Sequence, residues 1–111
     1  MREPTYYILA SLIEEPRHGW AIVQETADLS QGRVRLTAGT LYGALERLQA
    51  EGLVEQDREE IVKGRCRRYY RLTSLGRGHL QEEAERLAAS AEVVRKRMGA
   101  YRPPKVQEAP S

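Results

Sequence analysis

A run of basic side chains between Lys63 and Arg71 is the part of this sequence best suited to binding chemistry. The run holds five basic residues and no acid, and Tyr69 and Tyr70 stand among them. Guanidinium and ammonium groups bind phosphate oxygens, and interleaved aromatic residues are typical of surfaces that bind nucleic acid. Gly64 lies within the run as a turn-forming residue. The run therefore predicts an element held against a phosphate backbone.

The segments on either side of this run have the pattern of two strands. Residues 53–58 alternate apolar and polar side chains, and residues 67–73 are rich in tyrosine. Two such segments around a glycine predict a β-hairpin with residues 59–66 as its charged tip. Near the tip, Lys63, Arg65 and Arg67 are expected to reach DNA. Further down, Arg68 and Arg71 are expected to brace the strand.

An amphipathic helix precedes the hairpin. Apolar side chains recur at helical spacing from Leu41 to Leu48, Thr37 is a residue type that caps helix N-termini, and Gly52 suits the left-handed residue after a helix end. A third helix followed by a basic hairpin is typical of a winged helix-turn-helix, in which that helix enters the major groove. We therefore predict a mainly α fold with a small β-hairpin, the wing, followed by a long C-terminal helix.

The outward face of this helix is small and has polar edges. Gly43 lies opposite the apolar stripe, where a small residue lets a helix sit deep in the groove, and Thr40, Tyr42 and Arg47 can reach phosphates or base edges from its sides. For Tyr42, packing on the neighbouring helix stays open as a second interpretation. The predicted DNA-binding residues are Arg35, Thr37, Thr40, Tyr42, Gly43, Arg47, Lys63, Arg65 and Arg67.

Two helices are expected ahead of this one. Residues 5–15 are apolar on nearly all sides, which is typical of a helix buried on more than one face. A turn around His18 follows, and we expect His18 to hydrogen-bond within it. The second helix carries Trp20, Val23 and Ala27 on its apolar face, so Trp20 is predicted to lie in the core.

A long helical segment follows Thr73. Its apolar residues alternate spacings of four and three over three heptads, from Leu80 to Tyr101. Because a helix of this length would overhang so small a domain, we expect it to pair with a second copy, with packing on the chain's own core as the alternative. The predicted dimer interface comprises Tyr7, Leu80, Ala84, Leu87, Ala91, Val94 and Met98.

Length and composition exclude several classes of protein. The 111 residues suffice for one domain, here divided into a DNA-binding domain at 1–76, a dimerisation helix at 77–102 and a disordered tail at 103–111. No apolar run approaches the roughly 20 residues of a membrane span and no signal peptide is evident, so a cytoplasmic protein is expected. One cysteine and two histidines cannot build a Cys-rich zinc site, and no catalytic constellation is evident. We expect no metal, no cofactor and no enzymatic activity.

Three motifs in order resemble the PadR family of bacterial transcriptional regulators. Residues 8–20, ILASLIEEPRHGW, are similar to the family's opening helix and His-Gly-aromatic turn. Residues 39–54 resemble its recognition helix, and residues 64–76 resemble the second wing strand and the start of the last helix. The resemblance implies a homodimeric transcriptional repressor that binds a palindromic operator in double-stranded DNA. The length is similar to the short branch of the family, whose C-terminal part is one dimerising helix.

Three properties remain open at the level of the sequence. Some short members of the family bind flat aromatic compounds through an aromatic residue on the last helix, but this chain has none between Tyr70 and Tyr101, so a ligand of that kind is not expected and a different small-molecule effector stays open. Cys66 lies among arginines that favour a thiolate, and it is interpreted as incidental, with a redox-sensing wing as the alternative. A winged-helix module that binds protein is the alternative function, against which the basic run argues.

Overall fold

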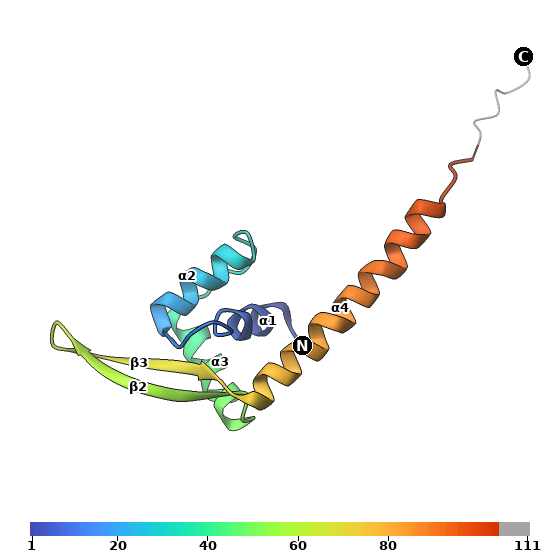
Figure 1. Cartoon of the computed structure of the whole chain (residues 1–111). Coiled ribbons are helices and arrows are strands. Elements are labelled where there is room, and N and C mark those ends of the chain that lie inside the picture. Colours follow the sequence, from blue (N-terminus) through green and yellow to red (C-terminus); the bar gives the residue numbers. More distant parts are fainter. Residues whose placement is uncertain (105–111) are drawn as a thin grey trace, which may run out of the picture.

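The computed structural model describes residues 1–104 as four helices and a three-stranded antiparallel sheet (Figure 1). The elements are, in order, α1 (Glu3–Ala10), β1 (Arg17–His18), α2 (Gly19–Leu29), α3 (Ala38–Ala50), β2 (Val54–Val62), β3 (Arg65–Leu72) and α4 (Ser74–Ala100). This architecture confirms the predicted mainly α fold with a small hairpin. The predicted tail falls almost entirely outside the described residues, and the predicted division at residue 76 stays a prediction.

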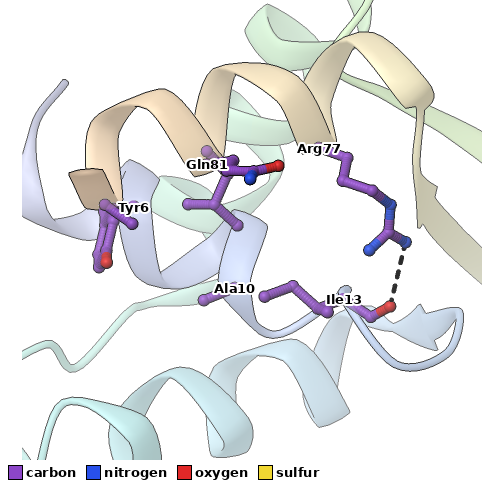
Figure 2. A pocket seen from close by; sticks show the side chains of 7 residues that line it. Tyr6, Ala10, Ile13, Arg77 and Gln81 are labelled. Atoms are coloured by element: carbon purple, nitrogen blue, oxygen red, sulfur yellow. Dashed lines mark hydrogen bonds between the residues drawn. The ribbon is translucent and has the colours of Figure 1, made fainter. Parts of the chain in front are cut away.

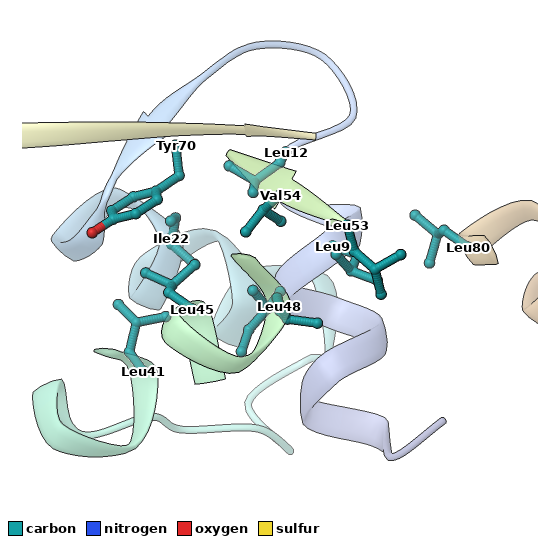
Figure 3. Packing of buried hydrophobic residues seen from close by; sticks show 11 residues of the cluster. Leu9, Leu12, Ile22, Leu41, Leu45, Leu48, Leu53, Val54, Tyr70 and Leu80 are labelled. Carbon is teal, nitrogen blue, oxygen red and sulfur yellow. The ribbon is translucent and has the colours of Figure 1, made fainter. Parts of the chain in front are cut away.

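One face of every helix and the base of the hairpin meet in a single core (Figure 3). α3 contributes its whole predicted stripe, whereas α4 contributes only Leu80 near its start. The buried cluster consists of Ile8, Leu9, Leu12, Ile22, Leu41, Leu45, Leu48, Leu53, Val54, Tyr70 and Leu80. Burial of this apolar surface is the main stabilising contribution to the fold.

The ends of α3 follow the predicted capping chemistry. The Thr37 hydroxyl oxygen accepts a hydrogen bond from the backbone N–H of Thr40 at 3.2 Å, which satisfies one of the free donors of the first turn. Gly52, just past the helix, has a φ of +77°, the left-handed conformation that favours glycine. Both predictions are confirmed, and they fix the start of α3 and its connection to the wing.

The hairpin is longer and its turn tighter than predicted. β2 extends to Val62 and β3 begins at Arg65, so residues 59–62 form strand and only Lys63 and Gly64 make the turn. Both turn residues have positive φ, 51° and 76°. Two successive residues of that kind match the twist of the flanking strands and allow pairing up to the turn. The predicted hairpin is confirmed, but its strands extend into residues 59–62 and 65–66, which were expected to belong to the charged tip, and the wing is a two-stranded arm that projects from the body (Figure 1).

A third strand and a shorter first helix also differ from the sequence-based prediction. α1 ends at Ala10 rather than near Glu15, and two short turn bonds follow it, among them Ile13 N–H to the Ala10 carbonyl at 3.2 Å. β1 then pairs with β3, with His18 opposite Tyr69. His18 also caps α2, because its Nδ1 accepts the Ala21 N–H, which confirms its predicted role within the turn.

The orientation of α2 differs from the prediction as well. Trp20 is 65 % exposed, so its predicted place in the core was wrong. The buried face of α2 instead consists of Gly19, Ile22 and Thr26, again at helical spacing. Gly19 must face α3 because a side chain there would strike Tyr42, and this requirement turns the next residue, Trp20, toward solvent.

Candidate nucleic-acid interface

The exposed face of α3 is open and small. Gly39, Thr40 and Gly43 are exposed, and a Cβ built at either glycine would meet no atom within 4 Å. Neighbouring parts of the chain therefore leave this face clear. A helix with such a face can approach the floor of a major groove closely, with Thr40 as a hydrogen-bonding group on it.

Tyr42 lies over the first residue of α2. A Cβ at Gly19 would be 2.6 Å from the Tyr42 hydroxyl oxygen, so the ring packs directly against the helix start. The residue is nevertheless half exposed. The two predicted interpretations of Tyr42 are thus compatible, because the ring packs on the neighbouring helix while the side chain remains accessible.

Two arginines precede α3 and differ in their surroundings. Arg33 forms an ion pair with Glu3 of α1, with 3.0 Å between guanidinium nitrogen and carboxylate oxygen. Arg35 forms no ion pair within residues 1–104, and its guanidinium lies close to the left-handed Gly32 of the same loop. Arg35 is therefore the one of this pair whose charge is available next to the start of α3.

Arg47 is directed toward α1. Its guanidinium donates a hydrogen bond to the buried Thr5 hydroxyl at 2.9 Å, across 42 positions of sequence. The predicted role of Arg47 was a contact to DNA from the edge of α3. In the free protein this side chain instead joins the recognition helix to the first helix.

The arginines of the wing fall into two groups. Arg71 forms a salt bridge with Glu55, and Arg68 lies 3.3 Å from Glu59, so both hold β3 against β2 as predicted. By contrast, three exposed basic residues toward the tip form no ion pair within the described chain: Lys63, Arg65 and Arg67. Arg67 lies opposite Glu60 in the register of the two strands, but none of the three side chains is held in a salt bridge in this part of the chain, so their charge is available to a phosphate.

Tyr69 lies where the wing meets the body of the domain. The Arg58 guanidinium lies 4.0 Å from the centre of its ring, its hydroxyl donates to Glu60 at 3.1 Å, and the His18 ring meets it edge-on at 5.4 Å. Burial, and secondly the charge of Arg67, lower the pKa of His18, which keeps the imidazole neutral near pH 7 and able to cap α2. The contact with His18 fixes the wing relative to the start of α2.

The predicted dimer interface divides into a buried and an exposed part. Leu80 lies in the core of its own chain and Ala84 is half-buried, as the alternative of self-packing predicts for this segment. Beyond them α4 leaves the body (Figure 1), and its stripe is uncovered, with Leu87 at 41 % and Met98 at 70 % exposure. Also exposed on this stripe are Ala91 and Val94.

An apolar groove of about 280 Å³ lies between α1 and α4 (Figure 2). Its walls include Tyr6, Ala10 and Ile13 of the N-terminal segment and Leu80 and Ala84 of α4. Tyr7, the predicted interface residue of α1, is half-buried and meets Tyr6 edge-on. The groove is continuous along α4 with the exposed stripe.

Within residues 1–104, no helix combines the length and hydropathy needed to cross a membrane. The same part of the chain contains no cluster of three or more His, Cys, Asp or Glu side chains that could hold a metal ion.

Three helices with a small open face on the third, followed by a basic hairpin fixed beside it, define a winged helix-turn-helix domain. The chain belongs to the transcriptional regulator PadR-like family, whose model matches residues 8–82. This confirms the resemblance drawn from the three motifs. The family is one of regulators and not of enzymes, in agreement with the prediction.

Known relatives support the same assignment. Transcriptional regulator Rv3488 of Mycobacterium tuberculosis is 39 % identical over 88 residues, which cover 79 % of this chain and 78 % of that protein. A PadR-like transcription factor from Bacteroides fragilis is 32 % identical, with a TM-score of 0.69 over 83 % of this chain and 86 % of the other. Bacillus subtilis PadR, solved in complex with operator DNA, shares the fold with a TM-score of 0.66 at 18 % identity, over 99 % of this chain and 54 % of that one.

The sequence alone missed Trp20 as a surface residue near the wing. The missed signal was the spacing of Gly19, Ile22 and Thr26, which marks a second, less hydrophobic stripe on the same helix. A stripe that includes glycine and threonine scores lower in hydrophobicity than one with tryptophan. This stripe is nevertheless the buried one, because α3 approaches α2 at Gly19 more closely than a larger residue would allow.

Proposed function

We propose that this chain is a homodimeric repressor that binds a palindromic operator in double-stranded DNA. In each half-site α3 lies in the major groove and the wing lies against the backbone or the minor groove. The observation that carries this proposal is the set of three basic residues of the wing that form no salt bridge within residues 1–104, Lys63, Arg65 and Arg67, together with the open face of α3. Cations fixed next to a small helical face are suited to a helix seated in a groove with phosphates at its flank.

The proposed base readout rests on α3 and the residues at its start. Thr40 and Gly43 face the major groove of the DNA. Arg35, Thr37 and Tyr42 flank the N-terminus of α3, where the helix dipole favours a phosphate. Base contacts specify a sequence, whereas phosphate contacts position the domain. Arg47 belongs to this set only if it exchanges its bond to Thr5 for one to DNA.

The proposed dimer is supported by the exposed stripe on α4 and the groove beside it. Leu87, Ala91, Val94 and Met98 form a continuous apolar line that projects from the body, and a second copy with the same line and groove can cover both. A two-fold dimer presents two recognition helices, which implies two half-sites of inverted sequence. Repression is supported by the family resemblance alone.

Salt-dependent DNA binding tests the proposal. Arg65→Ala and Arg67→Ala should weaken binding to a mixed-sequence duplex, and each should lower the slope of log affinity against log salt by about 0.9 per lost phosphate contact. In a symmetric dimer each substitution removes the phosphate contact from both subunits, so the change in slope is doubled. Arg71→Ala is the matched control, because Arg71 is bound to Glu55 and should change neither quantity.

The outcome separates this function from the alternative. If both wing variants bind duplex DNA with parental affinity and slope, the wing does not touch DNA, and a protein-binding winged-helix module becomes the better assignment. Footprinting on the chain's own upstream region identifies the operator. On that operator, changes at Thr40 or Gly43 should cost roughly 1 to 3 kcal/mol of discrimination while random-sequence binding survives.

A further inference from the structure

A cleft lies between the wing and the start of α2. The DNA contacts proposed for α3 and for the tip of the wing assign it no role. Its walls are formed by His18 and Trp20 from the β1–α2 junction, Tyr42 from α3, and Cys66, Arg67 and Arg68 from β3. Three elements that are distant in sequence thus meet around one opening. The ring of Tyr69 meets His18 and so joins the wing to the β1–α2 junction, and Tyr42 of α3 packs against Gly19 of the same junction, so the cleft is already formed in the free protein.

The lining of this cleft is suited to an anion with an apolar part. No acidic side chain lines it, Arg67 forms no ion pair within residues 1–104, and Arg68 has only an exposed pairing with Glu59. Exposed ion pairs are weak, so a phosphate can compete for such an arginine. The cleft is open and its volume is about 260 Å³, below the roughly 300 to 1,000 Å³ of enclosed small-molecule sites. An extended chain that passes through it fits better than a compact ligand.

Trp20 supplies the apolar wall. A tryptophan exposed to 65 % is unusual, because this side chain combines a large apolar ring with a single N–H donor and is normally covered. Here it lines the same cleft as Arg67 and the half-exposed Tyr42 of α3. An indole in this position can pack on a sugar ring while its N–H bonds a neighbouring phosphate.

We propose that this cleft grips one strand of the DNA sugar-phosphate backbone, with the Trp20 ring against a deoxyribose, its Nε1–H donated to a phosphate oxygen, and Arg67 on the opposite wall. This inference rests on the proposed function and adds a third contact to it, between α3 in the major groove and the wing tip. The contact is independent of sequence, since sugar and phosphate are the same at every step of the duplex.

Fluorescence tests the proposal on the unmodified protein. Trp20 is the only tryptophan of the chain, so selective excitation reports on this cleft alone. A mixed-sequence duplex at low salt should shift the emission to shorter wavelength and protect Trp20 from quenching by acrylamide. Both effects should disappear at high salt, together with binding itself. Inorganic phosphate at the same phosphate concentration should leave the emission unchanged, and equal protection by phosphate would overturn the assignment to a strand.

Substitution gives a second and independent test. Trp20→Ala should weaken binding to the mixed-sequence duplex at least about tenfold, as expected for a hydrogen bond to a charged group. Trp20→Phe keeps a ring but loses the donor, and should retain only part of the affinity. Neither change removes a charge, so the salt slope should stay parental, unlike that of Arg67→Ala. Leu29→Ala is the matched control, because Leu29 is an exposed apolar residue at the other end of α2.

The two proposals fail in different ways. If the protein binds no duplex at all, the proposed function fails. If it binds duplex with the predicted response to Arg65→Ala, but Trp20 emission and Trp20→Ala affinity are unchanged, only the cleft assignment is overturned. Because Trp20 is exposed, its replacement should leave the fold intact, and circular dichroism of each variant checks this point.

Discussion

α3 and α4 carry the same kind of apolar stripe but bury it differently. In α3, Leu41, Leu45 and Leu48 are almost completely covered by the rest of the chain. In α4 only the beginning of the stripe is covered, and from Leu87 onward the side chains face solvent. α3 has 13 residues and is enclosed by the body, whereas α4 has 27 and extends beyond it (Figure 1).

The difference shows what a hydrophobic period does and does not predict. The period predicts that one face of a helix is buried, but the partner that covers it depends on the helix length and on where the helix crosses the body. α3 reads as a core helix with a free outer face for DNA. α4 is a core helix for its first three turns, and after that its exposed stripe is the surface of the proposed dimer.

The junction where α4 meets the body should give the largest effect on stability. A Cβ at Gly76 would lie 2.0 Å from the Leu53 carbonyl oxygen and 2.8 Å from Leu72 Cδ1, so Gly76→Ala should cost about 3 kcal/mol through overpacking against backbone. Gly78→Ala, two residues on and free of neighbours within 4 Å, should instead gain about 0.5 to 1 kcal/mol. Urea unfolding at one fixed protein concentration measures both. Equal midpoints for the two variants would show that α4 does not dock through Gly76.

The exposed part of α4 should matter for assembly and not for the folding of the body. Leu87→Glu places a charge on the exposed stripe and should convert the proposed dimer to monomer in sedimentation at micromolar concentration, because an unpaired charge is costly to bury. Ala89→Glu is the matched control, since Ala89 is exposed on the opposite face of the same helix and should leave the dimer intact. An unchanged dimer in Leu87→Glu would contradict this stripe as the interface.

Local signals explain which features were predictable from sequence. The N-cap of Thr37, the left-handed Gly52 and the stripe of α3 each depend on residues within one or two turns of each other, and all three are found as predicted. The basic run also identifies the wing, although it does not locate the turn at Lys63 and Gly64. These features follow from backbone preferences that hold before any tertiary contact forms.

The unpredicted features depend on contacts between distant segments. Trp20 is outside the core because Gly19 lies under Tyr42, and β1 exists because two residues meet the edge of β3. Likewise, the bond from Arg47 to Thr5 joins residues 42 positions apart. Only the first of these contacts leaves a periodic pattern in the sequence, the weak stripe of Gly19, Ile22 and Thr26 on α2. The candidate site was therefore predictable in its elements but not in the cleft between them.

Arg47 provides a smaller test, on the polar edge of α3. If its bond to Thr5 positions the recognition helix, Arg47→Met and Thr5→Val should weaken duplex binding to a similar extent, about 1.5 kcal/mol, and the double variant should lose no more than either alone. The salt slope should stay parental in all three. A lower slope for Arg47→Met, with Thr5→Val unchanged, would instead support the predicted contact of Arg47 with DNA.

Glu83 provides the corresponding polar test on α4, where the helix leaves the body. Hydrogen bonds from Arg86 and from the Met1 amino group, the latter at 3.0 Å, lower the pKa of this buried carboxyl from 4.5 to about 2. The unfolded chain thus binds this proton at a higher pH than the folded one does. The stabilisation is therefore complete above pH 4.5 and is lost as the pH falls toward about 2. Glu83→Gln should lower the unfolding midpoint at pH 7 and flatten its fall across this window. The adjacent and exposed Glu82, changed to Gln, should leave the parental profile. If Glu83→Gln keeps the full pH dependence, α4 is not anchored to the body through this carboxylate.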